Sequence, residues 1–114
     1  MDEKVQARIG HNEALFRVTN EEVTDMAGRA KTFEIVCECG YSNCRKMITV
    51  TSEAYERVRS HSDRFIVRAD HQIEEVETVV EVVDSGWELG SYFVVEKGEG
   101  VPRQVAEETD PRAR

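Results

Sequence analysis

The chain has 114 residues, of which 39% are hydrophobic and 33% are charged. This length suits a single domain that can bury a modest core. The net charge of −8, from 15 basic and 23 acidic residues, argues against a nucleic-acid partner, because proteins of that class usually carry a basic surface.

Membrane and export signals are not found in the sequence. No segment approaches the run of about 20 apolar residues that spans a membrane, and residues 1–6 lack the apolar centre of a signal peptide. We therefore expect a cytoplasmic protein. In that reducing compartment, clustered cysteines bind metals or take part in redox reactions more often than they form structural disulfides.

Residues 1–30 are expected to form one long amphipathic helix. Ile9, Phe16 and Val23 recur at seven-residue spacing, which is typical of an apolar helical stripe. Asn20 is a candidate cap that would divide the helix in two. Two interpretations stay open: the helix packs along its own sheet, or it pairs with a protein partner or a second copy through Phe16 and Val23.

Residues 31–98 are expected to form an α+β domain with a mainly antiparallel sheet of about five strands. Apolar alternation and β-branched runs predict these strands: 33–39, 46–50, 64–68, 76–83 and 92–97. A short second helix over 52–61 should turn Tyr55 and Val58 towards the core, with Arg59 mostly in solvent.

Two segments lie outside this regular pattern. Trp87 stands in a glycine-flanked loop, where it is either a core anchor or an exposed contact for a partner. After Gly98 the apolar periodicity is lost, so residues 99–114 are expected to be a flexible tail.

The chain has three cysteines, Cys37, Cys39 and Cys44, and all of them lie within eight residues. On an extended strand a Cys-x-Cys pair places both thiols on one face, and a four-residue turn returns the third thiol towards them. Gly40 would relieve backbone strain where the chain wraps an ion. His71, at the end of a later strand, would complete a tetrahedral Cys3His zinc site.

Other chemistry fits the same residues. Three close thiols could instead form a redox sensor, with a reversible disulfide and one free thiol. Glu38, between the first two ligands, is either the general base of a zinc enzyme or an exposed strand carboxylate. No phosphate-binding glycine loop or nucleophile elbow accompanies the cysteines, so we expect a structural zinc in a non-catalytic interaction or regulatory protein.

Several segments together resemble a group of small uncharacterised proteins common in actinobacteria. The matching segments are Phe33 to Gly40 with Cys44, Tyr55 to Arg59, Arg64 to Val67, His71, and Tyr92 to Lys97. The resemblance covers most of residues 10–112 and implies that the three cysteines and His71 act together, but it implies no activity or partner. This chain has Asp70 where the group commonly has glycine, which puts the tightness of that turn in question.

Overall fold

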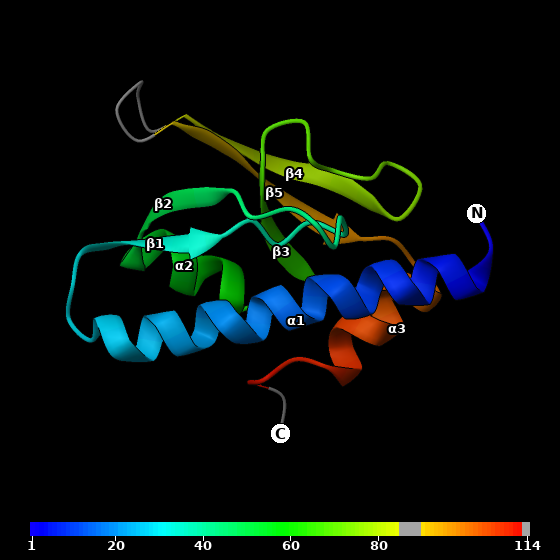
Figure 1. Ribbon diagram of the computed structural model, residues 1–114, viewed down its shortest axis with the longest axis horizontal. Helices are drawn as coiled ribbons and strands as arrows, with labels where there is room; N and C mark the ends of the chain where they lie inside the picture. The colour runs from blue at the N-terminus through cyan, green and yellow to red at the C-terminus, as the bar shows by residue number, and fades with distance from the viewer. Residues whose placement is uncertain (85–89, 113–114) are drawn as a thin grey trace.

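A computed structural model describes residues 1–84 and 90–112 of the chain (Figure 1). The elements, in chain order, are α1 (Glu3–Ala27), β1 (Thr32–Val36), β2 (Met47–Thr51), α2 (Ser52–Arg59), β3 (Arg64–Arg68), β4 (Glu77–Asp84), β5 (Ser91–Lys97) and α3 (Val101–Glu108). The predicted α+β class, the long N-terminal helix, the antiparallel strands and the short second helix are confirmed.

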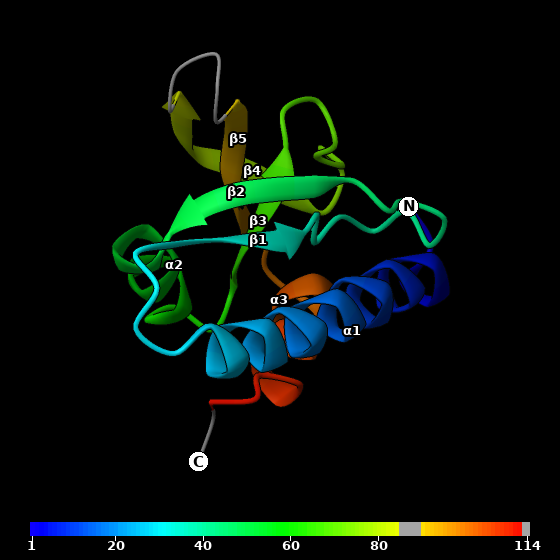
Figure 2. The same ribbon diagram turned by 60° about the vertical axis from the view of Figure 1, so that its left-hand side comes forward.

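The five strands form two sheets. β1 and β2 make an antiparallel hairpin in which Ile35 lies opposite Ile48. The other sheet has the order β3-β5-β4, is antiparallel throughout, and pairs Val67 with Phe93. In Figure 2 the hairpin runs across the three-stranded sheet. The two sheets share one core, which contains Ile35, Ile48 and Val67.

Helix α1 runs unbroken along one side of the molecule. Its N-cap Asp2 accepts a hydrogen bond from the Lys4 backbone N–H at 2.6 Å, and Gly28 ends it with a φ of 60°. Positive φ is a conformation in which glycine is unstrained, and it is common just after a helix. Asn20 does not divide the helix, because its side chain bonds to β1 instead.

The face of α1 that packs on the domain includes only one residue of the predicted apolar stripe, Ile9. The buried residues of the helix are Ile9, Gly10, Glu13, Ala14, Arg17 and Asn20. Phe16 and Val23 are only half-buried. A polar buried face is tolerated here because carbonyls and ionised groups from the rest of the chain supply its partners.

Glu13 is one of these buried polar groups. The Lys97 ammonium pairs with Glu13 and also with Glu77, the latter at 2.5 Å. Burial raises the pKa of Glu13 well above its usual value, Lys97 opposes this rise, and Glu77 adds to it. Since two carboxyl groups share a single ammonium, protonation of one of them leaves a neutral buried set.

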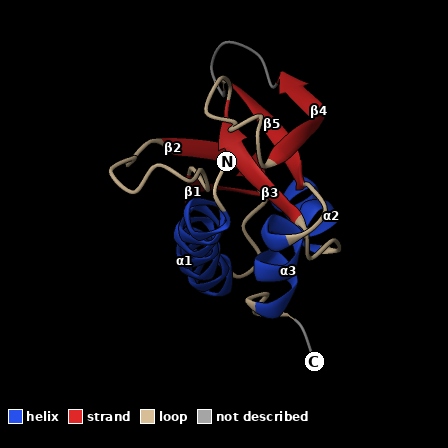
Figure 3. Cartoon of the chain, turned by 90° about the vertical axis from the view of Figure 1, so that its right-hand side faces the viewer, coloured by secondary structure: helices blue, strands red, loops and turns tan. Residues whose placement is uncertain are grey.

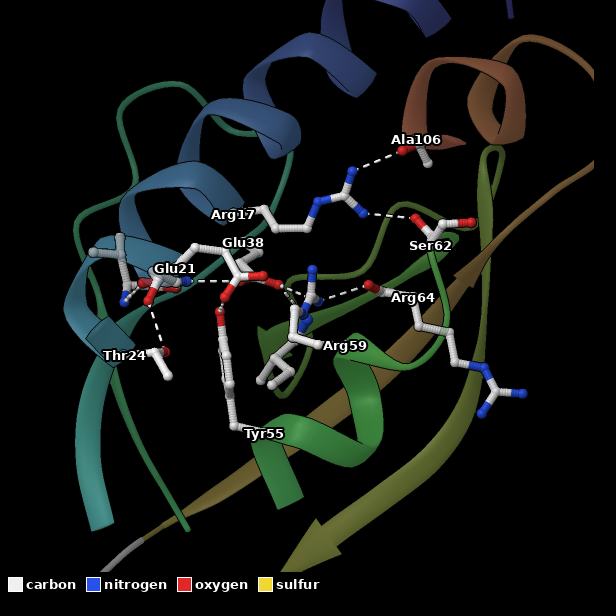
Figure 4. A network of polar contacts seen from close by, with 12 residues as sticks. Arg17, Glu21, Thr24, Glu38, Tyr55, Arg59, Ser62, Arg64 and Ala106 are labelled. Carbon is white, nitrogen blue, oxygen red and sulfur yellow. Dashed lines mark hydrogen bonds and ion pairs between the residues drawn. The ribbon is translucent and has the colours of Figure 1, made fainter. Parts of the chain in front are cut away.

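Arg17 is the second buried polar residue of α1. Its guanidinium donates to the carbonyls of Ser62 and Ala106, at 2.6 and 2.7 Å, and lies 4.4 Å from the centre of the Phe65 ring (Figure 4). Burial lowers the pKa of Arg17. The contacts join α1 to the segment before β3 and to α3, so the side chain holds three parts of the chain together.

Helix α2 begins after the N-cap Thr51. The Thr51 hydroxyl accepts from the Ala54 backbone N–H at 3.1 Å. Tyr55 and Val58 are buried as predicted. The prediction that Arg59 is solvated is wrong: it is 4% exposed, because a buried carboxylate and a carbonyl accept its hydrogen bonds.

The segment after Gly98 differs from the expected tail. Val101–Glu108 forms α3, which buries Val105 and Ala106 and lies beside α1 (Figure 3). A Cβ built on Gly10 of α1 would meet Val105 at 3.0 Å, so the two helices approach closely. The helix is short and its apolar positions are few, which is why its periodicity was not seen in the sequence.

Among the described residues, no helix combines the length and apolar character needed to cross a membrane. Trp87, the expected core anchor or partner contact, lies outside the described residues.

Candidate metal centre

The four predicted ligands lie together. One donor atom from each of Cys37, Cys39, Cys44 and His71 falls within 4.8 Å of all the others. The three cysteines are free thiols and are buried, and His71 is half-buried. Residues that are 34 positions apart in the sequence therefore meet in a single cluster able to hold a metal ion.

The cysteines come from the chain that links β1 to β2. Strand β1 ends at Val36, earlier than predicted, but the Cys37 N–H still donates to the Lys46 carbonyl at 2.8 Å and extends the hairpin. The Cys44 N–H then closes a turn on the Tyr41 carbonyl at 3.0 Å. Cys37 and Cys39 alternate in this extended segment, and so both reach the cluster.

His71 lies just after β3, the edge strand of the three-stranded sheet. It follows β3 through a turn in which its N–H donates to the Arg68 carbonyl at 3.0 Å. Asp70, just before it, has a φ of 70°. This left-handed conformation favours glycine but is tolerated by aspartate, so the turn before His71 forms with Asp70 in place.

Two of the donor separations match those of a tetrahedral zinc site. With zinc–sulfur and zinc–nitrogen bonds of about 2.3 and 2.05 Å, a tetrahedron places sulfur and nitrogen about 3.6 Å apart. The Sγ atoms of Cys37 and Cys44 each lie 3.6 Å from Nδ1 of His71. Three sulfur donors and one imidazole are also the ligand types that zinc prefers in closed sites.

The thiols are not equivalent. The Arg68 N–H donates to Cys37 Sγ at 3.2 Å. Hydrogen bonding between the two thiols raises the pKa of Cys37 and lowers that of Cys39 to about 5, since one sulfur keeps a proton that stabilises the other as thiolate. The cluster therefore favours a thiolate, which is the form that binds metal.

Glu38 lies on the opposite side of the same segment and is fully buried. Its carboxylate accepts from Asn20 Nδ2 at 2.7 Å, from the Ile66 N–H at 2.9 Å and from Arg59 at 3.2 Å (Figure 4). Neither an exposed carboxylate nor a free general base describes this residue. It fixes the cysteine segment to α1, α2 and β3 at once.

The cysteine segment also pairs with the free edge of β3. The Glu38 N–H donates to the Ile66 carbonyl at 2.9 Å, while the Ile66 N–H returns a bond to the Glu38 side chain. The Arg68 N–H, two residues further, donates to Cys37. The segment thus bridges the two sheets and covers an edge that would otherwise be unpaired.

Helix α1 forms hydrogen bonds with the cysteine segment through two asparagines. Asn20 donates to the Val36 carbonyl and accepts from the Val36 N–H, both at 2.8 Å. Asn12 donates to the Gly40 carbonyl at 3.2 Å. Both asparagines thereby satisfy backbone groups near the cluster.

Gly40 is required for a different reason from the one expected. Its φ is not in the left-handed region. A Cβ at this position would lie 2.5 Å from a methyl group of Ile9 and 3.0 Å from Ile73. Gly40 therefore allows close approach of the cysteine segment to α1.

Sequence reasoning missed the supporting residues Asn20, Glu38 and Arg59. A charged residue between two predicted ligands was the available signal, because alternation sends it away from the metal side. Comparisons with protein-family models, curated proteins and solved structures found no match for this chain.

Proposed function

We propose that this is a small zinc-binding, non-catalytic interaction protein in which the metal is structural. The observation that carries the proposal is the pair of 3.6 Å separations between cysteine Sγ atoms and His71 Nδ1, which equal the edge of a tetrahedral zinc site. Cys37, Cys39, Cys44 and His71 would hold the ion.

The structural role is supported by where the ligands originate. The three cysteines lie in the segment that links the two strands of the hairpin, and His71 follows the edge strand of the other sheet. An ion held by all four joins the two sheets at the point where their backbones already meet. Because the unfolded chain lacks this site, metal binding free energy becomes folding free energy.

The non-catalytic role is supported by Glu38. This carboxylate stands between two of the ligands in the sequence, and it is fully buried with hydrogen bonds to three other groups. Acting as a general base would require it to leave the charged Arg59 unpaired in the interior, which is costly. A closed four-ligand shell is also typical of structural zinc rather than catalytic zinc.

A thiol-based redox sensor is the second candidate. The three thiols are close enough to react with one another, and the pKa of Cys39 is lowered to about 5. However, Cys37 and Cys39 are both 0% exposed, and sensor thiols need to be reached by oxidant. Burial therefore favours the metal site.

The test is elemental analysis of protein purified without an affinity tag. We expect one zinc ion per chain, loss of the metal in His71→Ala, and its retention in His61→Ala, a control because His61 is exposed. A chelator should unfold the wild type, seen as loss of helical circular dichroism. Metal-free protein with reversible peroxide-dependent thiol loss would favour the redox sensor instead.

A further inference from the structure

The outward side of α1 carries a row of exposed side chains. Leu15 is 64% exposed, Val18 40% and Met26 81%. Helical periodicity places Arg8, His11 and Glu22 on the same side, and all three are exposed. We call this row of six residues the outer face of α1; it is opposite the side that carries Glu13, Arg17 and Asn20.

Nothing in the described part of the chain covers the outer face. Figure 3, which looks nearly along α1, shows β1 above the helix and α3 beside it. Arg8 and Glu22 make no ion pair with any residue of 1–84 or 90–112. Three apolar side chains in a line on an exposed helix, flanked by unpaired charges, are typical of a contact surface.

The order of the charges identifies the partner. Arg8 and Glu22 lie seven positions before and seven positions after Leu15. A two-fold axis at Leu15 would therefore place Arg8 of one copy opposite Glu22 of the other, twice. We propose that the outer face of α1 pairs antiparallel with the same face of a second copy of this chain.

Antiparallel pairing also suits the apolar residues. Leu15 would meet its own copy at the axis, and Met26 would lie opposite Lys4, whose aliphatic stem can cover it. A parallel pair would instead set Arg8 against Arg8 and Glu22 against Glu22, which is repulsive. The sequence order thus selects one orientation.

The contact involves one helix from each copy, so its area is smaller than that of an obligate dimer, and association should depend on concentration. The inference rests on the proposed function only in naming the partner of an interaction protein. The pairing needs α1 in place but does not use the metal ligands, so metal content and oligomeric state can be measured separately.

The test is sedimentation equilibrium of the full zinc-loaded chain at concentrations up to about 1 mM, which covers weak association. We expect a reversible dimer. Arg8→Glu or Glu22→Arg alone should weaken it about tenfold, because two ion pairs become two repulsions. The double variant should restore wild-type association.

Glu53→Arg is the matched control. It makes the same charge change as Glu22→Arg on an exposed position of α2, away from the outer face, and should leave the association constant unchanged. Zinc content and circular dichroism of each variant confirm the fold. A wild-type chain that stays monomeric, or a double variant that stays as weak as the single ones, would overturn the proposal; loss of zinc with intact dimerisation would instead count against the metal site.

Discussion

Glu38→Gln is the substitution that most directly tests how the cysteine segment is held. The variant keeps the side-chain volume and an oxygen that can accept from the Ile66 N–H, but it removes the negative charge facing Arg59. It also presents an amide where Asn20 donates. The backbone and the metal ligands are left untouched.

The expected loss follows from burial. The side chains of Glu38 and Arg59 are 0% and 1% exposed, so the pair is shielded from solvent and salt. Removing one partner of a buried ion pair costs about 3–5 kcal/mol, because the remaining charge stays in the interior. Domains of this size have a free energy of unfolding of about 5–15 kcal/mol, so the loss should be a large and measurable fraction of it. Substituting Arg59→Met in the same variant should recover part of it.

Urea unfolding at a fixed free zinc concentration measures this loss. Glu34→Gln is the control, because Glu34 is an exposed glutamate four positions earlier on the same hairpin and should change the free energy of unfolding by no more than about 0.5 kcal/mol. Glu38→Gln should still bind zinc. If the two variants had equal stability, the carboxylate could not be holding the segment.

Two further substitutions test local packing and ionisation. Gly40→Ala should lower the free energy of unfolding by about 1–3 kcal/mol, because its Cβ would lie 2.5 Å from Ile9. Gly98→Ala is the control and should cost less, because its nearest contact is at 3.4 Å. Equal thermal midpoints of the two variants would contradict this prediction. Glu13→Gln should gain stability relative to wild type as the pH rises above about 4.5. The raised pKa of Glu13 means that the folded wild type keeps a proton that the unfolded chain releases above its usual pKa of 4.5, so the wild type loses stability as pH rises. A stability difference in urea that does not change with pH would show that Glu13 stays ionised beside Lys97.

Local patterns predicted the elements well. Alternation identified β1 and β3, and the β-branched run identified β4. Thr51 and Gly28 lie at helix ends in the structure, where the hydrogen-bonding and φ preferences of threonine and glycine act over a few residues. The grouping of Cys37, Cys39 and Cys44 was also readable, since a strand and a turn place their thiols within reach of one another.

The buried face of α1 was not readable from the sequence. Periodicity selects apolar residues, yet three of the six buried residues of α1 are Glu13, Arg17 and Asn20. Arg17 and Asn20 form hydrogen bonds with groups distant in the chain, and Glu13 forms an ion pair with Lys97. Such partners are not visible in a local window. The burial of Arg59 in α2 was not predicted for the same reason, because its partner Glu38 is distant in the chain.

The sequence by itself determined the ligand types, the strand alternation that separates Glu38 from the cysteines, and the helix that ends at Gly28. Only the tertiary structure decided that five strands form two sheets, that Glu38 locks the cysteine segment to α1, α2 and β3, and that His71 completes the cluster from the second sheet. The physical reason is range: backbone propensity acts between neighbours, whereas burial of charge and assembly of a four-ligand site require groups that meet only after the chain has folded.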